Sequence, residues 1–198
     1  GKSQIAGEVV ALNLVAVKFQ FGGIQFEAAR FQVIQKNIRL GAAGNAIGRM
    51  LMGLTGNPIL GADLSQAAMQ RFSEQGGQQS SLRQVMAEAD IVIATTGAAG
   101  LIRPEMVRPG QIILALSNPN PEIDPEVALQ HGAAFAADGK SVNNVLGFPG
   151  IFRGAVDAHS PRITHEMLVA AAETIASMTP SGELVPSPLE KSVHLAVA

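Results

Sequence analysis

The sequence has 198 residues, an apolar fraction of 47% and a net charge of −2, so it can bury a substantial core but offers no basic surface to a nucleic acid. It contains no cysteine, which excludes disulfides and thiolate-bound metals. The most apolar early run, residues 9–17, is too short to span a membrane and lacks the flanks of a signal peptide, so we expect a cytoplasmic protein with no membrane partner.

Residues 1–30 are predicted to form a leading helix and a connection. Apolar residues recur at helical spacing over residues 5–19, and Gly22 and Gly23 interrupt the segment that follows. The helix could belong to the core or to a subunit interface, because its apolar pattern fits both.

Strands and helices are predicted to alternate from residue 30 to residue 138. Short apolar or alternating runs indicate strands at 30–38, 57–63, 90–96, 110–117 and 133–138. Helices are predicted at 43–56, after Ser65, after a capping box made by Ser81 and Gln84, and at 124–132, where Asp124 is the N-cap. This order indicates an α/β fold, a Rossmann-like doubly wound parallel sheet with helices on both faces.

The remaining chain is predicted to be a helical C-terminal tail. Helices are expected at 148–158, 164–178 and 187–198, and Ser187, Pro188 and Glu190 are expected to start the last one.

The stretch "NIRLGAAGNAIG" (37–48) resembles a glycine-rich dinucleotide-binding turn between a strand and a helix. Gly41 and Gly44 fit the second and third glycines of G-x-G-x-x-G, where the backbone must approach a pyrophosphate at a helix start. Arg39 takes the place of the first glycine, so either a remodelled turn binds the cofactor or affinity is lost. An ordinary strand–helix turn is the alternative. The cofactor-binding residues predicted here are Gly41, Ala42, Ala43, Gly44 and Asn45.

Asp63 ends the second predicted strand, nineteen residues after Gly44. An acid at this place can hydrogen-bond the adenosine ribose and would repel a 2′-phosphate, so the sequence predicts NAD in preference to NADP. The alternative is a loop Asp that caps the next helix.

The segment "TTGAAG" (95–100) follows a buried strand. Its hydroxyls and glycine suit contact with a phosphate or ribose, so Thr95, Thr96 and Gly97 are predicted to bind the cofactor. A turn that merely needs small residues is the alternative.

Two later segments, "LALSNPNPEI" (114–123) and "SVNNVLGFPGIFRGAVDA" (141–158), resemble the malic enzyme family, which oxidises and decarboxylates malate to pyruvate. "GAAGNAI", "ADIVIATTG" and "ITHEM..AAA..IA" resemble that family in the same order. The likeness runs from residue 31 to the end and is most specific over 90–198. It implies the C-terminal NAD-binding domain of the family.

The resemblance assigns roles to three asparagines. Asn118 and Asn143 are expected at the cofactor, and Asn118 and Asn144 are expected to orient the substrate, because an amide can donate to a malate carboxylate without titrating. The alternative is that these side chains only cap loops and helices.

The other titratable side chains predict neither a metal site nor a catalytic set within this chain. The histidines His131, His159, His165 and His194 lack ligand spacing, and His165 and Glu166 are expected at a solvated helix start. The three carboxylates of "PEIDPE" (121–126) are predicted to be helix N-terminal charges.

In the malic enzyme family the base is a lysine, the acid is a tyrosine, and three carboxylates hold magnesium or manganese, all before the dinucleotide domain. This chain has no tyrosine, and its lysines do not match the catalytic position. The resemblance therefore implies that the catalytic N-terminal domain and its Mg or Mn lie outside this chain, which alone is expected to be inactive.

We therefore predict one NAD(P)-binding Rossmann-type domain over 1–198, with a leading helix and connection (1–30), a dinucleotide-binding core (31–138), and a substrate-side loop with C-terminal helices (139–198). The parent reaction would convert (S)-malate and NAD to pyruvate, CO2 and NADH, and the family implies a homodimer. Two alternatives stay open. One is a non-catalytic nucleotide-binding module, favoured by Arg39 and the absent tyrosine. The other is a Rossmann-type dehydrogenase of the amino-acid or folate type, against which "VNNVLGFPG" argues.

Overall fold

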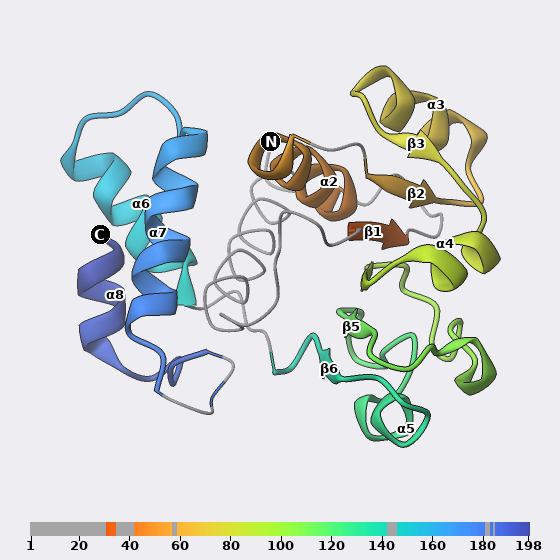
Figure 1. Ribbon diagram of the computed structural model, residues 1–198. Helices are drawn as coiled ribbons and strands as arrows, with labels where there is room; N and C mark the ends of the chain where they lie inside the picture. Colours follow the sequence, from red (N-terminus) through yellow and green to blue (C-terminus); the bar gives the residue numbers. More distant parts are fainter. Residues whose placement is uncertain (1–30, 35–41, 57–58, 142–145, 181–182, 184) are drawn as a thin grey trace. The chain divides into compact units, whose positions relative to one another are not determined.

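The computed structural model describes residues 31–34, 42–56, 59–141, 146–180, 183 and 185–198 (Figure 1). The chain divides into two compact units, one of residues 26–141 and one of residues 1–25 with 142–198, and each is described by itself. The helix predicted at 5–19 and the connection after it lie outside the described residues. The expectation of a single domain over 1–198 stays a prediction.

A six-stranded parallel sheet forms the centre of the first unit (Figure 1). Its strands are β1 (Phe31–Ile34), β2 (Leu60–Ala62), β3 (Gln78–Gln79), β4 (Ile91–Ala94), β5 (Ile112–Ala115) and β6 (Phe135–Asp138). They lie in the order β3-β2-β1-β4-β5-β6, so the chain reverses its direction of winding between β1 and β4. The predicted doubly wound parallel sheet is confirmed.

The strands β4 and β5 are apolar along their whole length. Every residue of β4 and of β5 is buried, because helices cover both faces of a doubly wound sheet and leave no polar face. The short strand β3 was not predicted, since its two residues are exposed glutamines that show neither an apolar run nor alternation.

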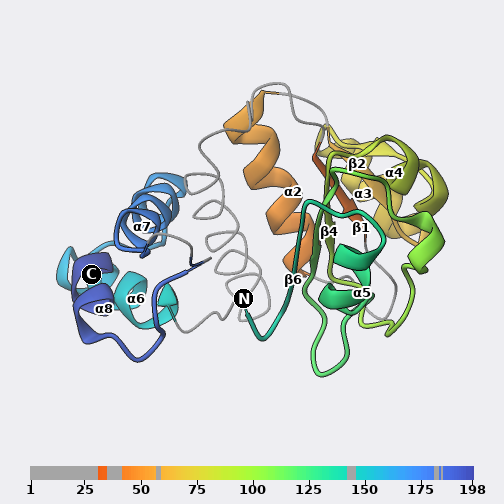
Figure 2. The same ribbon diagram turned by 60° about the horizontal axis from the view of Figure 1, so that its bottom comes forward.

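Helices connect the strands and start where capping residues predict. They are α2 (Ala42–Thr55), α3 (Gln66–Glu74), α4 (Leu82–Glu88) and α5 (Pro125–Gln130), with a short 3-10 turn η1 (Pro104–Met106). The side chains of Ser65, Ser81 and Asp124 accept backbone N–H groups at the starts of α3, α4 and α5, as expected of N-caps. Helix α2 covers one face of the sheet, and α4 and α5 cover the other (Figure 2).

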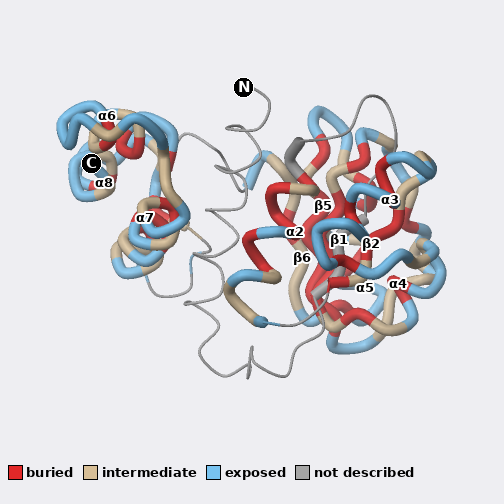
Figure 3. Tube along the Cα trace, turned by 90° about the horizontal axis from the view of Figure 1, so that it is seen from above, coloured by how far each residue is buried: buried red, intermediate tan, exposed pale blue. Residues whose placement is uncertain are grey.

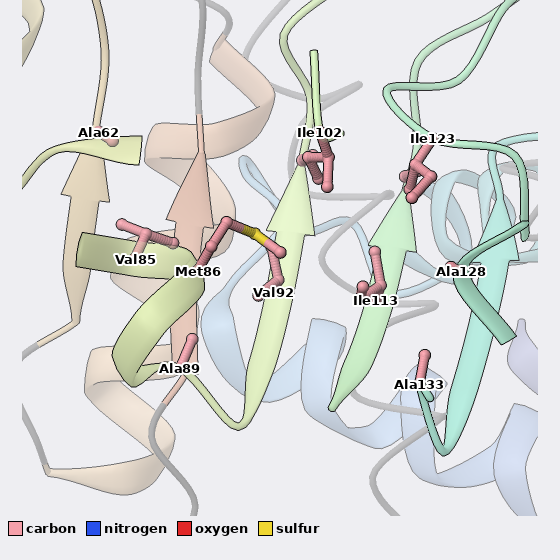
Figure 4. Close-up of a cluster of buried hydrophobic side chains, with 12 residues drawn as sticks. Ala62, Val85, Met86, Ala89, Val92, Ile102, Ile113, Ile123, Ala128 and Ala133 are labelled. Atoms are coloured by element: carbon pink, nitrogen blue, oxygen red, sulfur yellow. The ribbon is translucent and has the colours of Figure 1, made fainter. Parts of the chain in front are cut away.

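Buried residues of the first unit gather on the strands and on the stretches of helix that face them (Figure 3). On the face covered by α4 and α5, Val92 and Ile113 of the central strands belong to one cluster with Val85 and Met86 of α4 and with Ala128 of α5 (Figure 4). This burial is the main favourable term that holds the helices on the sheet.

One aromatic ring occupies the junction between α2, α3 and β2. Phe72 of α3 is only 4% exposed, and its ring lies against the backbone of Gly48, Gly61 and Gly77. A Cβ atom at Gly61 would lie 2.5 Å from the ring and one at Gly48 would lie 2.8 Å from it. The glycines therefore allow α3 to approach α2 and β2 closely.

A buried glutamine connects α4 to the sheet at the end where the strands β4 and β5 begin. Gln111 is 1% exposed, and its amide donates to the carbonyl oxygens of Met86 (3.1 Å) and Ala89 (2.8 Å) at the end of α4. Its Oε1 accepts the backbone N–H of Arg108 at 3.1 Å. These two carbonyl groups at the end of α4 thereby gain partners outside the helix.

The described part of the second unit is helical, as the sequence predicts. It contains α6 (Phe148–Asp157), α7 (His165–Ser177) and α8 (Lys191–Val197), and α8 contacts both of the others. A Cβ atom at Gly150 of α6 would lie 2.7 Å from Val197, so the two helices meet where α6 carries a glycine. None of the helices among the described residues has the length and apolarity that a membrane span needs.

The predicted start of the last helix is wrong. Helix α8 begins at Lys191 with Glu190 as its N-cap. Ser187 lies in a turn before it, because the Ser187 carbonyl accepts the Glu190 N–H at 3.1 Å and its hydroxyl accepts the Leu189 N–H at 3.4 Å. A serine followed by proline can start a turn as well as a helix, and sequence alone did not separate the two.

Candidate functional site

The end of β2 opens onto a shallow hollow that is partly open to solvent. Gly61 and Ala62 of the strand lie along the wall of this hollow, and the ring of Phe72 packs against the backbone of Gly61. The lining residues are Asn45, Gly61, Ala62, Asp63, Ala68, Met69 and Phe72. The structure thus brings together two residues that the sequence singled out, Asn45 of α2 and Asp63 after β2.

Asp63 lies at the mouth of this hollow and is partly exposed. Its Oδ1 atom accepts the backbone N–H of Ser65 at 2.7 Å, which fixes the carboxylate before the start of α3. The N-cap of α3 is Ser65 itself, so Asp63 is not the capping residue that the alternative proposed. Among the described residues no group hydrogen-bonds Oδ2, which leaves that atom available to a ligand.

The glycine turn is described only in part. Gly44 is buried in the first turn of α2, and Ala42 and Ala43 begin that helix. Arg39 and Gly41 lie outside the described residues, so the effect of Arg39 on the turn stays a prediction. The same holds for Asn143 and Asn144.

A second group of polar residues lies where β4 and β5 end. Glu122 is fully buried, and its carboxylate accepts four hydrogen bonds. The backbone N–H and the hydroxyl of Thr96 donate at 2.6 and 2.7 Å. The hydroxyl of Ser117 and its backbone N–H, at 3.3 Å, supply the other two. Glu122 therefore joins the loop after β4 to the loop after β5.

The same two loops share further hydrogen bonds. The Ser117 hydroxyl oxygen accepts the Gly97 N–H at 2.7 Å, and the Thr96 hydroxyl oxygen accepts the Ala98 N–H at 3.1 Å. The backbone N–H of Ile102 donates to the carbonyl oxygen of Glu122 at 3.0 Å. The N–H groups of residues 96 to 98 are thus all engaged within the protein.

The predicted cofactor residues of this loop differ in what they expose. Gly97 is exposed with φ +70°, and no atom lies within 4 Å of the place where a Cβ would stand, so a ligand can approach its backbone. The Thr95 hydroxyl is buried and has no hydrogen-bond partner within the described part of the chain. Thr96 is 7% exposed, with its amide and hydroxyl directed at Glu122. Their contacts with a cofactor stay predictions.

Asn118 follows Ser117 directly and is exposed between the ends of β5 and β6. A Cβ atom at Gly139 would clash with the carbonyl oxygen of Leu116 and would lie 2.6 Å from the Asn118 amide nitrogen, so a glycine allows the residue after β6 to approach the loop after β5 closely. Asp138 stabilises the neighbouring turn by accepting hydrogen bonds from Lys140 and Ser141. Burial opposes ionisation of Asp138, but these hydrogen bonds outweigh it and lower the pKa of its carboxyl group.

The prediction for the carboxylates of "PEIDPE" is partly wrong. Asp124 and Glu126 stand at the start of α5 as expected. Glu122 instead turns into the protein, where the hydroxyls and N–H groups of Thr96 and Ser117 replace the hydration that the carboxylate loses on burial. A usable signal was present, since Glu122 is flanked by Pro121 and Ile123 rather than by the polar residues of a solvated turn.

The start of α7 matches its prediction. His165 and Glu166 are exposed behind the N-cap Thr164, and a backbone hydrogen bond at this helix start lowers the pKa of Glu166. Within the described ranges, no three acidic, histidine or cysteine side chains gather as a metal site would require.

Four features define a Rossmann-type dinucleotide-binding domain. They are the strand order, the glycine-containing helix after β1, the acid after β2, and the hydrogen-bonded loops after β4 and β5. A family model described as "Malic enzyme, NAD binding domain" matches residues 125–191. The chain belongs to the malic enzyme family and corresponds to its NAD-binding domain.

Individual relatives agree with this family. The chain is 62% identical over 162 residues to NAD-dependent malic enzyme 1 of Bacillus subtilis, an alignment that covers 81% of this chain and 37% of that protein. It is 36% identical to the NAD-dependent malic enzyme of Geobacillus stearothermophilus, over 73% of this chain and 34% of that one. The crystal structure of NAD-dependent malic enzyme from Thermotoga maritima matches with a TM-score of 0.82 and 28% identity, covering 98% of this chain and 56% of the other. The chain thus spans little more than a third of these curated relatives.

Proposed function

We propose that this chain binds NAD and serves as the cofactor domain of an NAD-dependent malic enzyme. The whole protein would convert (S)-malate and NAD to pyruvate, CO2 and NADH. The observation that carries the proposal is Asp63 at the mouth of the hollow after β2, with one carboxylate oxygen available. The relatives from Bacillus subtilis and Geobacillus stearothermophilus are named as NAD-dependent, which supports the same cofactor.

The adenosine half of NAD fits the chemistry of this hollow. Asp63 stands at the mouth of the hollow, and its Oδ2 atom, to which none of the described residues donates, can accept a ribose hydroxyl. A 2′-phosphate would meet the negative charge of Asp63, and the described residues that line the hollow include no lysine or arginine to offset it. These features favour NAD over NADP.

The nicotinamide half is proposed to lie across the loops after β4 and β5, near Gly97 and Asn118. Bound NAD supplies the acceptor for the hydride that leaves malate. The Asn118 amide is exposed at this edge and can donate to a malate carboxylate, and we propose that Asn143 and Asn144 assist there. The base, the acid and the Mg or Mn ligands are proposed to come from an N-terminal catalytic domain outside these residues. We propose a homodimer on the resemblance alone, and a cytoplasmic location stays the expectation drawn from the sequence.

The cofactor proposal is tested by calorimetric titration of the chain with NAD and with NADP. We expect measurable binding of NAD and weaker binding of NADP. Asp63→Asn removes the charge with little change of shape, and we expect about tenfold weaker NAD binding and a smaller preference against NADP. Asp124→Asn is the matched control, because Asp124 is a carboxylate that caps α5 away from the hollow. Absence of heat up to millimolar NAD would contradict the proposal and favour a non-catalytic module.

A dehydrogenase of the amino-acid or folate type is not favoured, since the matched family model over 125–191 is that of malic enzymes. Solved structures of other dehydrogenases, such as L-tryptophan dehydrogenase from Nostoc punctiforme, resemble this chain at only 14% identity and therefore share the fold alone. A substrate panel with the full-length protein separates these chemistries, and turnover of an amino acid without turnover of malate would reverse the assignment.

A further inference from the structure

The burial of Glu122 needs a physical explanation, because a buried carboxylate is costly unless hydrogen bonds compensate for its lost hydration. Here four donors from two residues surround a side chain with 0% exposure. In the part of the chain that the structure describes, no lysine or arginine forms an ion pair with it. Its compensation therefore comes from the fixed dipoles of the two loops, and the loops are in turn fixed by it.

Glu122 also influences residues that it does not contact, because its direct partners make further hydrogen bonds. Ser117 and Thr96 each donate a hydroxyl proton to the carboxylate, and this orients their oxygen lone pairs toward the N–H groups of Gly97 and Ala98. Hydrogen bonds linked in series in this way strengthen one another. One carboxylate thus sets the backbone orientation of the exposed Gly97 turn and of the residue immediately before Asn118.

A comparison with Gln111 distinguishes the positioning of ligand-binding loops from a contribution to the stability of the fold alone. Gln111 is also a buried polar side chain next to β5, but it holds the end of α4 at the edge where the strands begin. Glu122 holds the loops at the edge where the strands end, which is where parallel sheets of this order bind ligands.

We propose that Glu122 is a positioning residue that holds the loops after β4 and β5 as one rigid surface, so that Gly97 and Asn118 meet the nicotinamide half of the cofactor in a fixed geometry. Glu122 itself does not touch the ligand. The inference rests on the proposed NAD function for its effect on binding, but its effect on loop rigidity does not depend on a ligand.

The test compares Glu122→Gln with Gln111→Met in the full chain. Glutamine keeps the size of Glu122 but replaces an acceptor by an amide that donates, so it opposes the N–H and O–H groups facing it. We expect amide hydrogen exchange at Gly97 and Ala98 to accelerate about tenfold or more in Glu122→Gln and to stay unchanged in Gln111→Met. The dissociation constant for NAD is expected to rise about tenfold only in Glu122→Gln, while both variants lose stability.

Two results would overturn the proposal. One is unchanged exchange at Gly97 and Ala98 in a folded Glu122→Gln variant, and the other is equal loss of NAD affinity in both variants. If the unsubstituted chain binds no NAD, the proposed function fails, and the exchange rates alone decide the role of Glu122. If Glu122→Gln does not fold, Ser117→Ala takes its place. It removes only the link between Gly97 and the carboxylate, and the same selective increase in exchange at Gly97 is expected, whereas no increase contradicts the proposal.

Discussion

The packing of Phe72 against glycine backbone predicts that Gly61→Ala destabilises the first unit. The new Cβ atom would lie 2.5 Å from Cε1 and 2.7 Å from Cδ1 of the ring, whereas carbon atoms pack best at about 3.5–4.0 Å. The ring cannot retreat freely, since the backbone at Gly77 faces the same two ring atoms. We therefore expect a loss of about 1–3 kcal/mol in the free energy of unfolding.

A double-mutant cycle tests this cause. Phe72→Leu destabilises by itself but removes the ring atoms that the added methyl group meets, so Gly61→Ala should cost much less in that background. The expected coupling energy is about 1–2 kcal/mol. Urea unfolding followed by far-ultraviolet circular dichroism suits a chain without tryptophan or tyrosine. Additive effects of the two substitutions would refute the reasoning, because the ring would then not be the obstacle.

Three further predictions concern other parts of the chain. Gly154→Ala would bring a Cβ atom against the carbonyl of Ala198, so we expect a lower urea midpoint and a loss of about 1–3 kcal/mol, whereas a gain would contradict the close contact. The lowered pKa of Asp138 means that its ionised form favours folding above the ordinary carboxyl pKa of 3.8, and this contribution is lost as the pH falls through the lowered value. Asp138→Asn should therefore flatten the decline of the urea midpoint below about pH 4, and an unchanged decline would count against it. The 198 residues alone should produce no pyruvate from malate and NAD, and detectable turnover would place the catalytic groups within this chain.

The fold was largely predictable because its determinants are local. The buried runs of β4 and β5 and the caps Ser65, Ser81 and Asp124 can be recognised within a few neighbouring residues. The proximity of Asn45 and Asp63 was also predictable, since the ends of adjacent parallel strands meet at one edge of a sheet.

What the sequence did not reveal depends on partners far apart in the chain. Pro121 and Ile123 hint that Glu122 is buried, but Thr96 lies 26 residues away from it, and nothing in the segment "PEIDPE" identifies that residue as its partner. The same is true of Gln111, whose carbonyl partners on α4 are 22 and 25 residues away. The role of Phe72 is equally hidden, because two of the glycines around it belong to other elements, Gly48 to α2 and Gly61 to β2.

The ring of Phe72 lines the hollow after β2 and also fills the junction of α2, α3 and β2. Enlarging that hollow for a bulkier nucleotide by trimming the ring would loosen α3 from the sheet. A change of nucleotide preference in this scaffold is therefore expected to arise at the rim, through Asp63 and the 75% exposed Leu64 beside it, while the floor stays as it is.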